Sequence, residues 1–354
     1  MLSLVSVCNG VQYYKAHIAV PVGAGQSGLN VGARFRQMNI PTLIIEKDDV
    51  VGDVWRKRYP SLTLHTPNTH HTCGWIDMAT ENINSRIVST VLYTRFHTNA
   101  PKFTPRDKVA SMLEQYAHNQ DLIIWNRSTV LPRPSYGSST KRWTVNILRN
   151  GAKVTLHPYH IVLAIGSLGK PYVPLLPGRE EFKGVALHAT NFKGASPFSG
   201  KNTIVVGASQ TASDICQQLA THGAASITMV QRSSTIVVSS DYTAANLEAL
   251  WPMHCDPSAG DFKAAGMPLG LLKQIEIGQK DTRVAQQKEM LDGLLKAGLN
   301  IDEGKEGGGQ VVQLFEKFGG KSYHLISPSL TISFTGYCTN FGYCSRLDFY
   351  SLPL

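Results

Sequence analysis

Three glycines near the N-terminus have a spacing that could hold a phosphate group. Gly23, Gly25 and Gly28 form the pattern GxGxxG. The first glycine allows a tight turn, the second lets backbone amides approach a pyrophosphate, and the third lets a helix pack closely on a sheet. The phosphates would lie at the positive end of that helix. Together with Gln26 and Ser27, these glycines form a candidate dinucleotide site.

The residues around this turn predict the elements that such a site needs. An apolar run over 18–22 predicts a buried strand, 29–38 predicts a helix, and 41–45 predicts a second buried strand. Glu46 follows about 20 residues after the turn, where a carboxylate would accept hydrogen bonds from a ribose 2′-hydroxyl. The alternative is an ordinary βαβ unit without a ligand. Pro21 argues against the pattern, because it removes a backbone donor from an expected central strand.

A second strand, turn and helix follow much later in the chain. The strand predicted over 202–206 leads into a degraded GxSxxA form of the same fingerprint. Serine still permits fairly close phosphate approach, and alanine is an accepted third residue. The candidate residues of this second turn are Gly207, Ser209, Gln210, Thr211 and Ala212.

The strand after this second helix does not end in an acid. The predicted helix 211–222 and strand 226–230 lead to Gln231 and Arg232. An arginine at this place accommodates a 2′-phosphate, which favours NADP over NAD, and the alternative is a surface arginine at a strand end. One site thus favours a ribose 2′-hydroxyl and the other a ribose 2′-phosphate. This difference predicts one tightly bound FAD and one exchanging NADPH, with the nicotinamide held near the flavin.

The loop after Glu46 adds two residues to the candidate site. Residues 51–67 mix glycine, proline and aromatic side chains, which predicts a long ordered loop, and such loops are usually functional. Trp55 is either a packing anchor or a ring that lies beside a bound cofactor. In the second interpretation Arg56 or Arg58 lies near the cofactor phosphates, so we include Trp55 and Arg56.

The intervening sequence predicts further elements. Residues 73–96 have no clear period and are interpreted as an insertion of uncertain structure. Thr104 and Pro105 predict the N-cap and first residue of a helix. Its core-facing residues are Val109, Met112, Leu113 and Tyr116. The other predictions are strands at 122–125, 142–148 and 153–156, a turn at 134–137, and a buried strand at 160–166.

Composition limits the class of protein. The 354 residues are enough for two domains, and 42% apolar with 17% charged residues indicates a globular chain. We interpret the net charge of +9 as a solvated basic face, although a basic field also attracts anionic cofactors or substrates. Nucleic-acid binding is not expected, because the sequence has no arginine-rich or aromatic-interleaved patch.

The cysteines and the N-terminal residues indicate in which cellular compartment the protein is expected. The six cysteines include no CxxC pair and no histidine at metal-ligand spacing, so we expect reduced thiols, a cytoplasmic protein and no metal site. Residues 1–7 are too few for a signal peptide and lack a basic region. No run approaches the roughly 20 apolar residues that a membrane helix needs.

These motifs together resemble the flavin-containing monooxygenases, within them the fungal and YUCCA-like group. Residues 182–192 match the family pattern FxGxxxHxxx(Y/F/W), and they lie between the two dinucleotide turns as in the family. Residues 52–56 match GxxWR, and 59–65 continue that match. The resemblance covers about residues 18–320, apart from the insertion at 73–96.

The resemblance implies an α/β fold with two Rossmann-like domains. The first part of the FAD domain would be 16–169, an inserted NADPH domain would be 170–299 beginning with a proline-rich linker, and 300–354 would return partly to the FAD domain with an atypical tail. NADPH would reduce FAD, and a flavin C4a-(hydro)peroxide formed with O₂ would transfer one oxygen atom to a small organic substrate. No catalytic residue is assigned, and His188 is interpreted as structural or interdomain.

The sequence differs from the family motifs at three places, and other functions therefore stay open. Ser209 weakens the second turn. Asn68 is not in clear register with an asparagine that helps hold the peroxide in part of the family, so that role is not assigned to it. Residues 333–337 resemble the closing segment of the FAD domain only faintly, so a C-terminal truncation is expected. The alternatives are a catalytically silent FAD- and NADP-binding protein and an uncoupled NADPH oxidase. A disulfide reductase is disfavoured, because no CxxC exists for thiol exchange.

Overall fold

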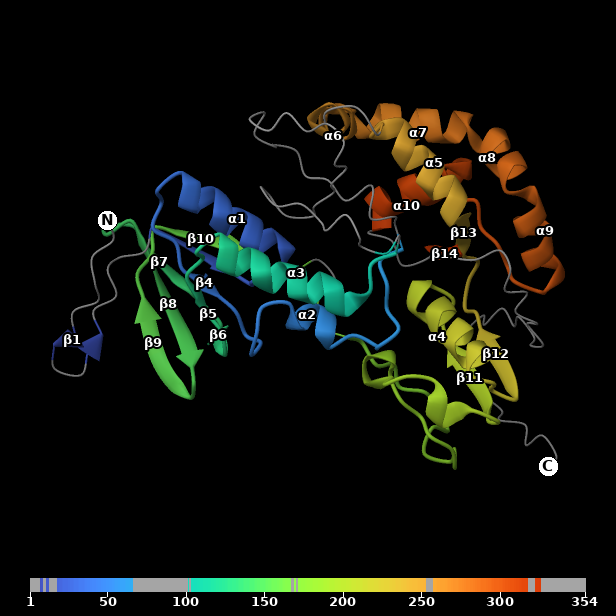
Figure 1. Cartoon of the computed structure of the whole chain (residues 1–354), viewed down its shortest axis with the longest axis horizontal. Coiled ribbons are helices and arrows are strands. Elements are labelled where there is room, and N and C mark those ends of the chain that lie inside the picture. Colours follow the sequence, from blue (N-terminus) through green and yellow to red (C-terminus); the bar gives the residue numbers. More distant parts are fainter. Residues whose placement is uncertain are drawn as a thin grey trace. The chain divides into compact units, whose positions relative to one another are not determined.

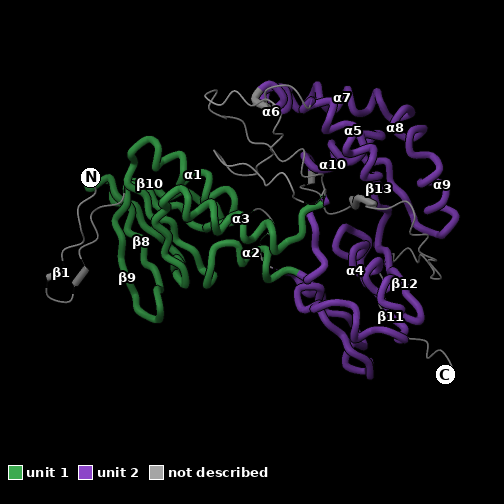
Figure 2. The backbone as a smooth tube through the Cα atoms, viewed as in Figure 1, with its two compact units in different colours: residues 1–58, 71–170 green, residues 59–70, 171–354 purple. Residues whose placement is uncertain are grey.

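The computed structural model divides the chain into two compact units (Figure 2). Unit 1 comprises residues 1–58 and 71–170, and unit 2 comprises residues 59–70 and 171–354. The structure describes residues 7–8, 11–12, 18–65, 101, 103–166, 169, 171–252, 257–317 and 322–325. The predicted insertion at 73–96 and the segment 333–337 lie outside the described residues.

Unit 1 combines a parallel sheet with an antiparallel one (Figure 1). Its described elements are β1 (Val7–Cys8), β2 (Val11–Gln12), β3 (Ala19–Val22), α1 (Gln26–Gln37), β4 (Ile44–Ile45), α2 (Asp53–Arg56), α3 (Arg106–Asn119), β5 (Ile124–Trp125), β6 (Ser128–Val130), β7 (Ser135–Gly137), β8 (Arg142–Arg149), β9 (Ala152–Leu156) and β10 (His160–Leu163). The parallel sheet has the order β10-β3-β4-β5, and β8 pairs antiparallel with β6, β7 and β9.

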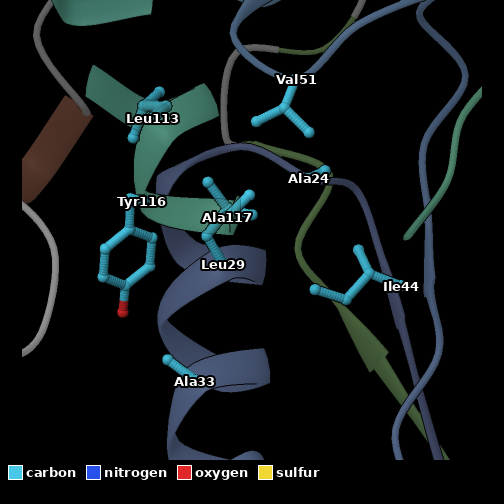
Figure 3. Close-up of a cluster of buried hydrophobic side chains, with 8 residues drawn as sticks. All are labelled: Ala24, Leu29, Ala33, Ile44, Val51, Leu113, Tyr116 and Ala117. Atoms are coloured by element: carbon cyan, nitrogen blue, oxygen red, sulfur yellow. The ribbon is translucent and has the colours of Figure 1, made fainter. Parts of the chain in front are cut away.

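Two buried clusters show that the parallel sheet of unit 1 lies between helices and the antiparallel sheet. On one face Ile44 packs with Leu29 of α1 and Leu113 of α3 (Figure 3). On the other face Ile45 packs with Val145 of β8. Successive residues of a strand point to opposite faces, so β4 contributes to both clusters. Burial on both faces explains why this strand is entirely apolar.

Pro21 explains why β4 is shorter than predicted. The amides of Ala19 and Gly23 donate to the carbonyls of Pro41 and Ile45. In a parallel strand the amide of residue 21 would point the same way, but proline has no N–H to donate. The ladder between β3 and β4 is therefore interrupted, and the regular pairing is reduced to Val22 with Ile45. The α/β class is nevertheless confirmed.

Helix α3 begins one residue later than predicted. The N-cap prediction for Thr104 is wrong, because the N-cap is Pro105 with extended backbone angles. Thr104 is fully buried, and its hydroxyl donates to the carbonyl of Pro101 at 3.5 Å. The predicted core face is correct: Val109, Leu113 and Tyr116 are buried, and Met112 packs against the same cluster.

Of two other predictions in unit 1, one is wrong and one is correct only in part. Residues 134–137 do not form a turn, because β7 pairs there with β8 and the chain reverses at 138–141 instead. The strand predicted over 160–166 forms and pairs parallel with β3, but it is shorter than predicted and is not buried. Strand β10 is the edge of the described sheet and ends at Leu163, which is 73% exposed, and Ile165 beyond it is 68% exposed.

Unit 2 contains two short parallel sheets and several helices. Its described elements are η2 (Ala189–Asn191), η3 (Ser196–Phe198), β11 (Asn202–Val206), α4 (Gln210–Thr221), β12 (Ser226–Val230), β13 (Ile236–Ser239), α5 (Ser240–Leu250), α6 (Pro257–Gly266), α7 (Leu269–Gly278), α8 (Lys280–Gln286), α9 (Lys288–Lys296), η4 (Lys305–Gly307), α10 (Gly309–Lys317) and β14 (Ser322–Leu325). Strand β11 pairs with β12, and β13 pairs with β14. Among the described helices of both units, none is long and apolar enough to cross a membrane.

Candidate dinucleotide-binding sites

The first glycine turn connects β3 to α1 with the predicted geometry. Gly23 has a φ of 107°, and its amide donates to the carbonyl of Ile45 at 2.8 Å. A Cβ atom at Gly28 would collide with the carbonyl oxygen of Gly23, so close packing of α1 requires glycine there. A Cβ at Gly25, the N-cap of α1, would meet no atom within 4 Å. The turn thus leaves open the space in which a phosphate could approach the helix N-terminus.

Glu46 is fixed by two backbone amides at the end of β4. Glu46 as a whole is only 8% exposed. Oε2 accepts from the amide of Ala24 at 2.6 Å, and Oε1 accepts from the amide of Asp48 at 2.9 Å. Each carboxylate oxygen can accept a further hydrogen bond. Glu46 can therefore stabilise the glycine turn and still accept from ribose hydroxyls, which fits a bound dinucleotide.

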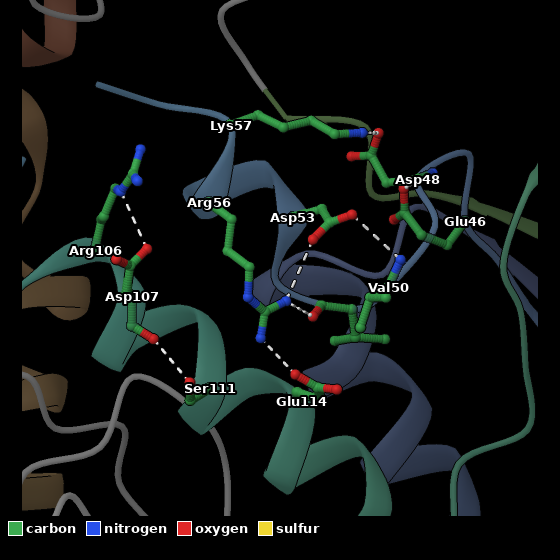
Figure 4. A network of polar contacts seen from close by, with 11 residues as sticks. Glu46, Asp48, Val50, Asp53, Arg56, Lys57, Arg106, Asp107, Ser111 and Glu114 are labelled. Atoms are coloured by element: carbon green, nitrogen blue, oxygen red, sulfur yellow. Dashed lines mark hydrogen bonds and ion pairs between the residues drawn. The ribbon is translucent and has the colours of Figure 1, made fainter. Parts of the chain in front are cut away.

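The other predicted residues of the first site lie on α1 and α2. Gln26 and Ser27 are exposed in the first turn of α1, while Trp55 is partly buried against the cluster shared by α1 and α3. Arg56 joins α2 to α3: its Nη1 donates to the carbonyl of Val51 at 2.9 Å, and its Nη2 pairs with Glu114 (Figure 4). A cofactor contact by Trp55 or Arg56 stays a prediction.

The second turn repeats this local geometry between β11 and α4. Gly207 has a φ of 126°, and its amide donates to the carbonyl of Val230 at 2.9 Å. Ser209 is the N-cap of α4, in the place that Gly25 has for α1, and both helices contain 12 residues. A Cβ at Gly207 would meet only the Cβ of Ala212, at 3.9 Å. Alanine at the third position is therefore compatible with the packing of this turn.

The structure places a buried amide where the first site has a carboxylate. Gln231 follows the strand residue that accepts from the turn glycine, as Glu46 does in the first site, and it is 2% exposed. Its Nε2 donates to the carbonyl of Asn300 at 2.8 Å and to the hydroxyl of Thr235 at 3.1 Å. That hydroxyl donates to the carbonyl of Ala208 at 2.9 Å. The neutral Gln231 network thus supports the second turn.

Arg232 and Thr211 are exposed beside this network, whereas Gln210 is half-buried. His188 is the N-cap of η2, and its ring nitrogen Nδ1 accepts from the amide of Thr190 at 3.3 Å. Such a cap is a structural contact, in agreement with the structural interpretation of this histidine. Sequence reasoning missed the part that Thr235 and Asn300 play, because neither residue belongs to a recognisable motif.

Ionisable groups near the two turns are mostly structural. Burial raises the pKa of the Cys216 thiol in α4 to about 12, so this cysteine is an unreactive apolar side chain. The hydrogen bond that Lys57 donates to Asp48 at 2.6 Å raises the pKa of the Lys57 ammonium. Within the described ranges, no group of three histidine, cysteine, aspartate or glutamate residues could hold a metal ion.

Comparisons with known proteins agree with this geometry. A family model described as pyridine nucleotide-disulphide oxidoreductase matches residues 20–250. The chain is 28% identical over 207 residues to the indole-3-pyruvate monooxygenase YUCCA1 of Oryza sativa subsp. japonica, covering 58% of this chain and 46% of that protein. It is 28% identical over 222 residues to the probable indole-3-pyruvate monooxygenase YUCCA9 of Arabidopsis thaliana, covering 62% and 48%.

The fold also resembles that of a solved structure. A flavin-containing monooxygenase from Stenotrophomonas maltophilia aligns with a TM-score of 0.51 and 22% identity, covering 63% of this chain and 60% of that chain. These matches confirm the predicted fold class and the predicted resemblance to flavin monooxygenases. The chain spans about half the length of the curated relatives that it matches.

Proposed function

Because the chain belongs to the pyridine nucleotide-disulphide oxidoreductase family, we propose that it is a flavin-dependent monooxygenase that uses FAD and NADPH. One observation carries the proposal: two turns of the same geometry are followed by residues of different charge. The first is followed by the buried carboxylate of Glu46, and the second by the amide of Gln231 and the cation of Arg232. A ribose diol suits the first arrangement, and a 2′-phosphate suits the second.

FAD would occupy the first turn. The backbone between Gly23 and Gly28 would hold its pyrophosphate, and Glu46 would accept from its ribose hydroxyls. When bound, the flavin supplies hydride acceptance from NADPH and the activation of O₂. The protein's own contribution is to bind and orient the cofactor.

NADPH would occupy the second turn. Arg232 would pair with the 2′-phosphate, because a guanidinium forms strong, charge-assisted hydrogen bonds with phosphate oxygens. Gln231 is neutral, so it avoids the like-charge repulsion that a carboxylate would cause at the same place. Residues 207–212 would bind the pyrophosphate at the N-terminus of α4. In the proposed reaction, O₂ supplies the oxygen atom and a small organic substrate accepts it.

The proposed domain organisation follows the two turns. Residues 16–169 would form the first part of the FAD domain, 170–299 the NADPH domain, and 300–354 a partial return to the FAD domain. The change from unit 1 to unit 2 after residue 170 supports the first boundary. We further propose a cytoplasmic location.

A second candidate is a FAD- and NADP-binding protein without monooxygenase activity. The exposed edge of the sheet that carries the first turn favours it, because Leu163 and Ile165 are apolar and largely exposed there. Parallel sheets are normally covered. The other alternative is an NADPH oxidase, in which the reduced flavin passes its electrons to O₂ and releases H₂O₂ without oxygenating a substrate.

The visible spectrum of the purified protein tests these proposals. We expect a yellow protein whose flavin bands bleach with NADPH more readily than with NADH. During turnover in air with an organic substrate that it oxygenates, it should release little H₂O₂ per NADPH consumed. Stoichiometric H₂O₂ would indicate the oxidase, and flavin that NADPH does not reduce would indicate the silent binding protein. Colourless protein that takes up no added FAD would contradict all three.

A further inference from the structure

A partly buried carboxylate in α4, that of Asp214, joins two side chains that lie about 150 residues earlier in the chain. The hydroxyl of Tyr59 donates to Oδ2 of Asp214 at 2.5 Å, and Nε2 of His65 lies 3.0 Å from the same oxygen. The side chains of His65 and Asp214 are 12% and 13% exposed, and Tyr59 is 6% exposed. All three residues belong to unit 2.

The position of Asp214 links this cluster to the second dinucleotide turn. Asp214 lies two residues after Ala212, the third position of the turn, and it is the fifth residue of α4. A carboxylate accepts hydrogen bonds, so the His65 ring carries a proton on Nε2 in this contact. Charge-assisted bonds of this kind are stronger than neutral ones, and an unsatisfied buried acceptor is costly. Tyr59 and His65 therefore restrain the N-terminal half of α4.

The residues between Tyr59 and His65 form an irregular segment. The segment contains no helix or strand, and the carbonyl of Tyr59 accepts from the amide of Leu62 at 3.1 Å. The bonds to Asp214 thus fix both ends of an irregular segment on one helix. Restraining a binding element before the ligand arrives lowers the entropy lost on binding.

We propose that Asp214 is a positioning residue of the second dinucleotide site, where it acts through Tyr59 and His65. These contacts hold residues 59–65 against the first two turns of α4, and so fix the orientation of the 207–212 turn that receives the dinucleotide pyrophosphate. Asp214 does not itself contact the nucleotide. The identity of that nucleotide as NADP(H) rests on the proposed function.

The test measures NADP⁺ binding to the FAD-loaded protein. We expect Asp214→Asn to raise the Kd for NADP⁺ about tenfold, and Tyr59→Phe and His65→Gln to raise it about threefold to tenfold, because each variant weakens a charge-assisted hydrogen bond. FAD retention should match the wild type. In steady state the loss should appear in KM for NADPH more than in kcat, whereas a merely structural defect would lower the content of folded holoenzyme.

Matched controls change the same residue types at exposed positions outside the Asp214 cluster. Tyr172→Phe changes a tyrosine that is 81% exposed, and Asp292→Asn changes an aspartate that is 57% exposed on α9. Neither should alter NADP⁺ affinity. The double variant Tyr59→Phe with Asp214→Asn should lose less affinity than the sum of the two single effects, because both changes act on the same bond.

The outcomes separate this inference from the proposed function. If the wild type binds NADP⁺ and the folded variants of Asp214, Tyr59 and His65 bind it equally well, the positioning role is overturned while the proposed function stands. If Asp214→Asn does not fold, Tyr59→Phe decides, because it keeps the ring and removes only the hydroxyl. A wild type that binds FAD but neither NADP⁺ nor NADPH overturns both.

Discussion

Glu46 at the end of β4 accepts a hydrogen bond from the amide of Ala24 in the glycine turn, at 2.6 Å. The residue that is predicted to bind the ribose therefore also fixes the loop that is predicted to bind the pyrophosphate. Glu46 is buried, and its two carboxylate oxygens accept from the backbone amides of Ala24 and Asp48. Cofactor binding and the shape of the turn should consequently depend on the same carboxylate.

The first prediction concerns this carboxylate. Glu46→Gln should weaken FAD binding about tenfold to hundredfold, because a hydrogen bond to a charged group contributes about 1.5–3 kcal/mol. Reconstitution of the flavin-free protein, followed by flavin fluorescence, measures the effect. Glu180→Gln is the matched control on an exposed glutamate. Equal FAD affinity in Glu46→Gln and the wild type would contradict the role.

Two glycines of the first turn should respond differently to the same added methyl group. Gly28→Ala places Cβ against the carbonyl oxygen of Gly23, so it should lower the free energy of unfolding by about 1–3 kcal/mol. Gly25→Ala meets no protein atom and should leave stability nearly unchanged while it weakens FAD binding. Chemical denaturation of the flavin-free proteins and FAD titration separate the two effects. A stable Gly28→Ala protein would show that α1 can shift away from the strand.

The local parts of both sites were predictable from the sequence. Each turn is encoded within about 30 consecutive residues by apolar periodicity and glycine spacing. Contacts between distant segments were not predictable. The bond of Gln231 to Asn300 spans 69 residues and that of Tyr59 to Asp214 spans 155, and neither leaves a periodic signal.

Errors in the predicted elements have similar physical causes. The apolar run 160–166 suggested burial, but β10 is the edge strand of the described sheet. Leu163 at its end is 73% exposed, and Ile161 is only partly buried against the core. Thr104 has the residue type of an N-cap, yet the extended backbone of Pro105 moves the helix start by one residue. Both outcomes depend on tertiary context, which outweighs local preference.

Arg232 should determine the choice between NADPH and NADH. Arg232→Ala should lower kcat/KM for NADPH about tenfold to hundredfold and leave that for NADH nearly unchanged, because only NADPH loses a charge-assisted hydrogen bond. Lys201→Ala removes an exposed cation elsewhere in unit 2 and serves as the control. Anaerobic stopped flow measures the rate of flavin reduction at varied concentrations of NADPH and of NADH, and so compares the two nucleotides directly. A parallel loss with NADPH and NADH would mean that Arg232 acts on the fold and not on the 2′-phosphate.

The last prediction concerns the pH dependence of stability in the helical part of unit 2. Burial raises the pKa of the Glu276 carboxyl, and the neighbouring Arg283 opposes this shift only in part. The folded state therefore binds a proton on Glu276 more tightly than the unfolded state does, and its contribution to stability is complete below the ordinary glutamate pKa. That contribution is lost as the pH rises through the raised value.

Glu276→Gln removes this dependence and keeps the size of the side chain. Arg283 still donates from Nη1 to the carbonyl of residue 276 at 3.0 Å and from Nη2 to the carbonyl of Gly307. Relative to the wild type, the variant should therefore gain thermal stability as the pH rises above the ordinary glutamate pKa and through the raised value. Scanning calorimetry across this range measures the difference, with Glu289→Gln on the exposed surface of α9 as the control. A gain in the opposite direction, towards low pH, would mean that the ion pair with Arg283 outweighs the cost of burying the Glu276 carboxylate.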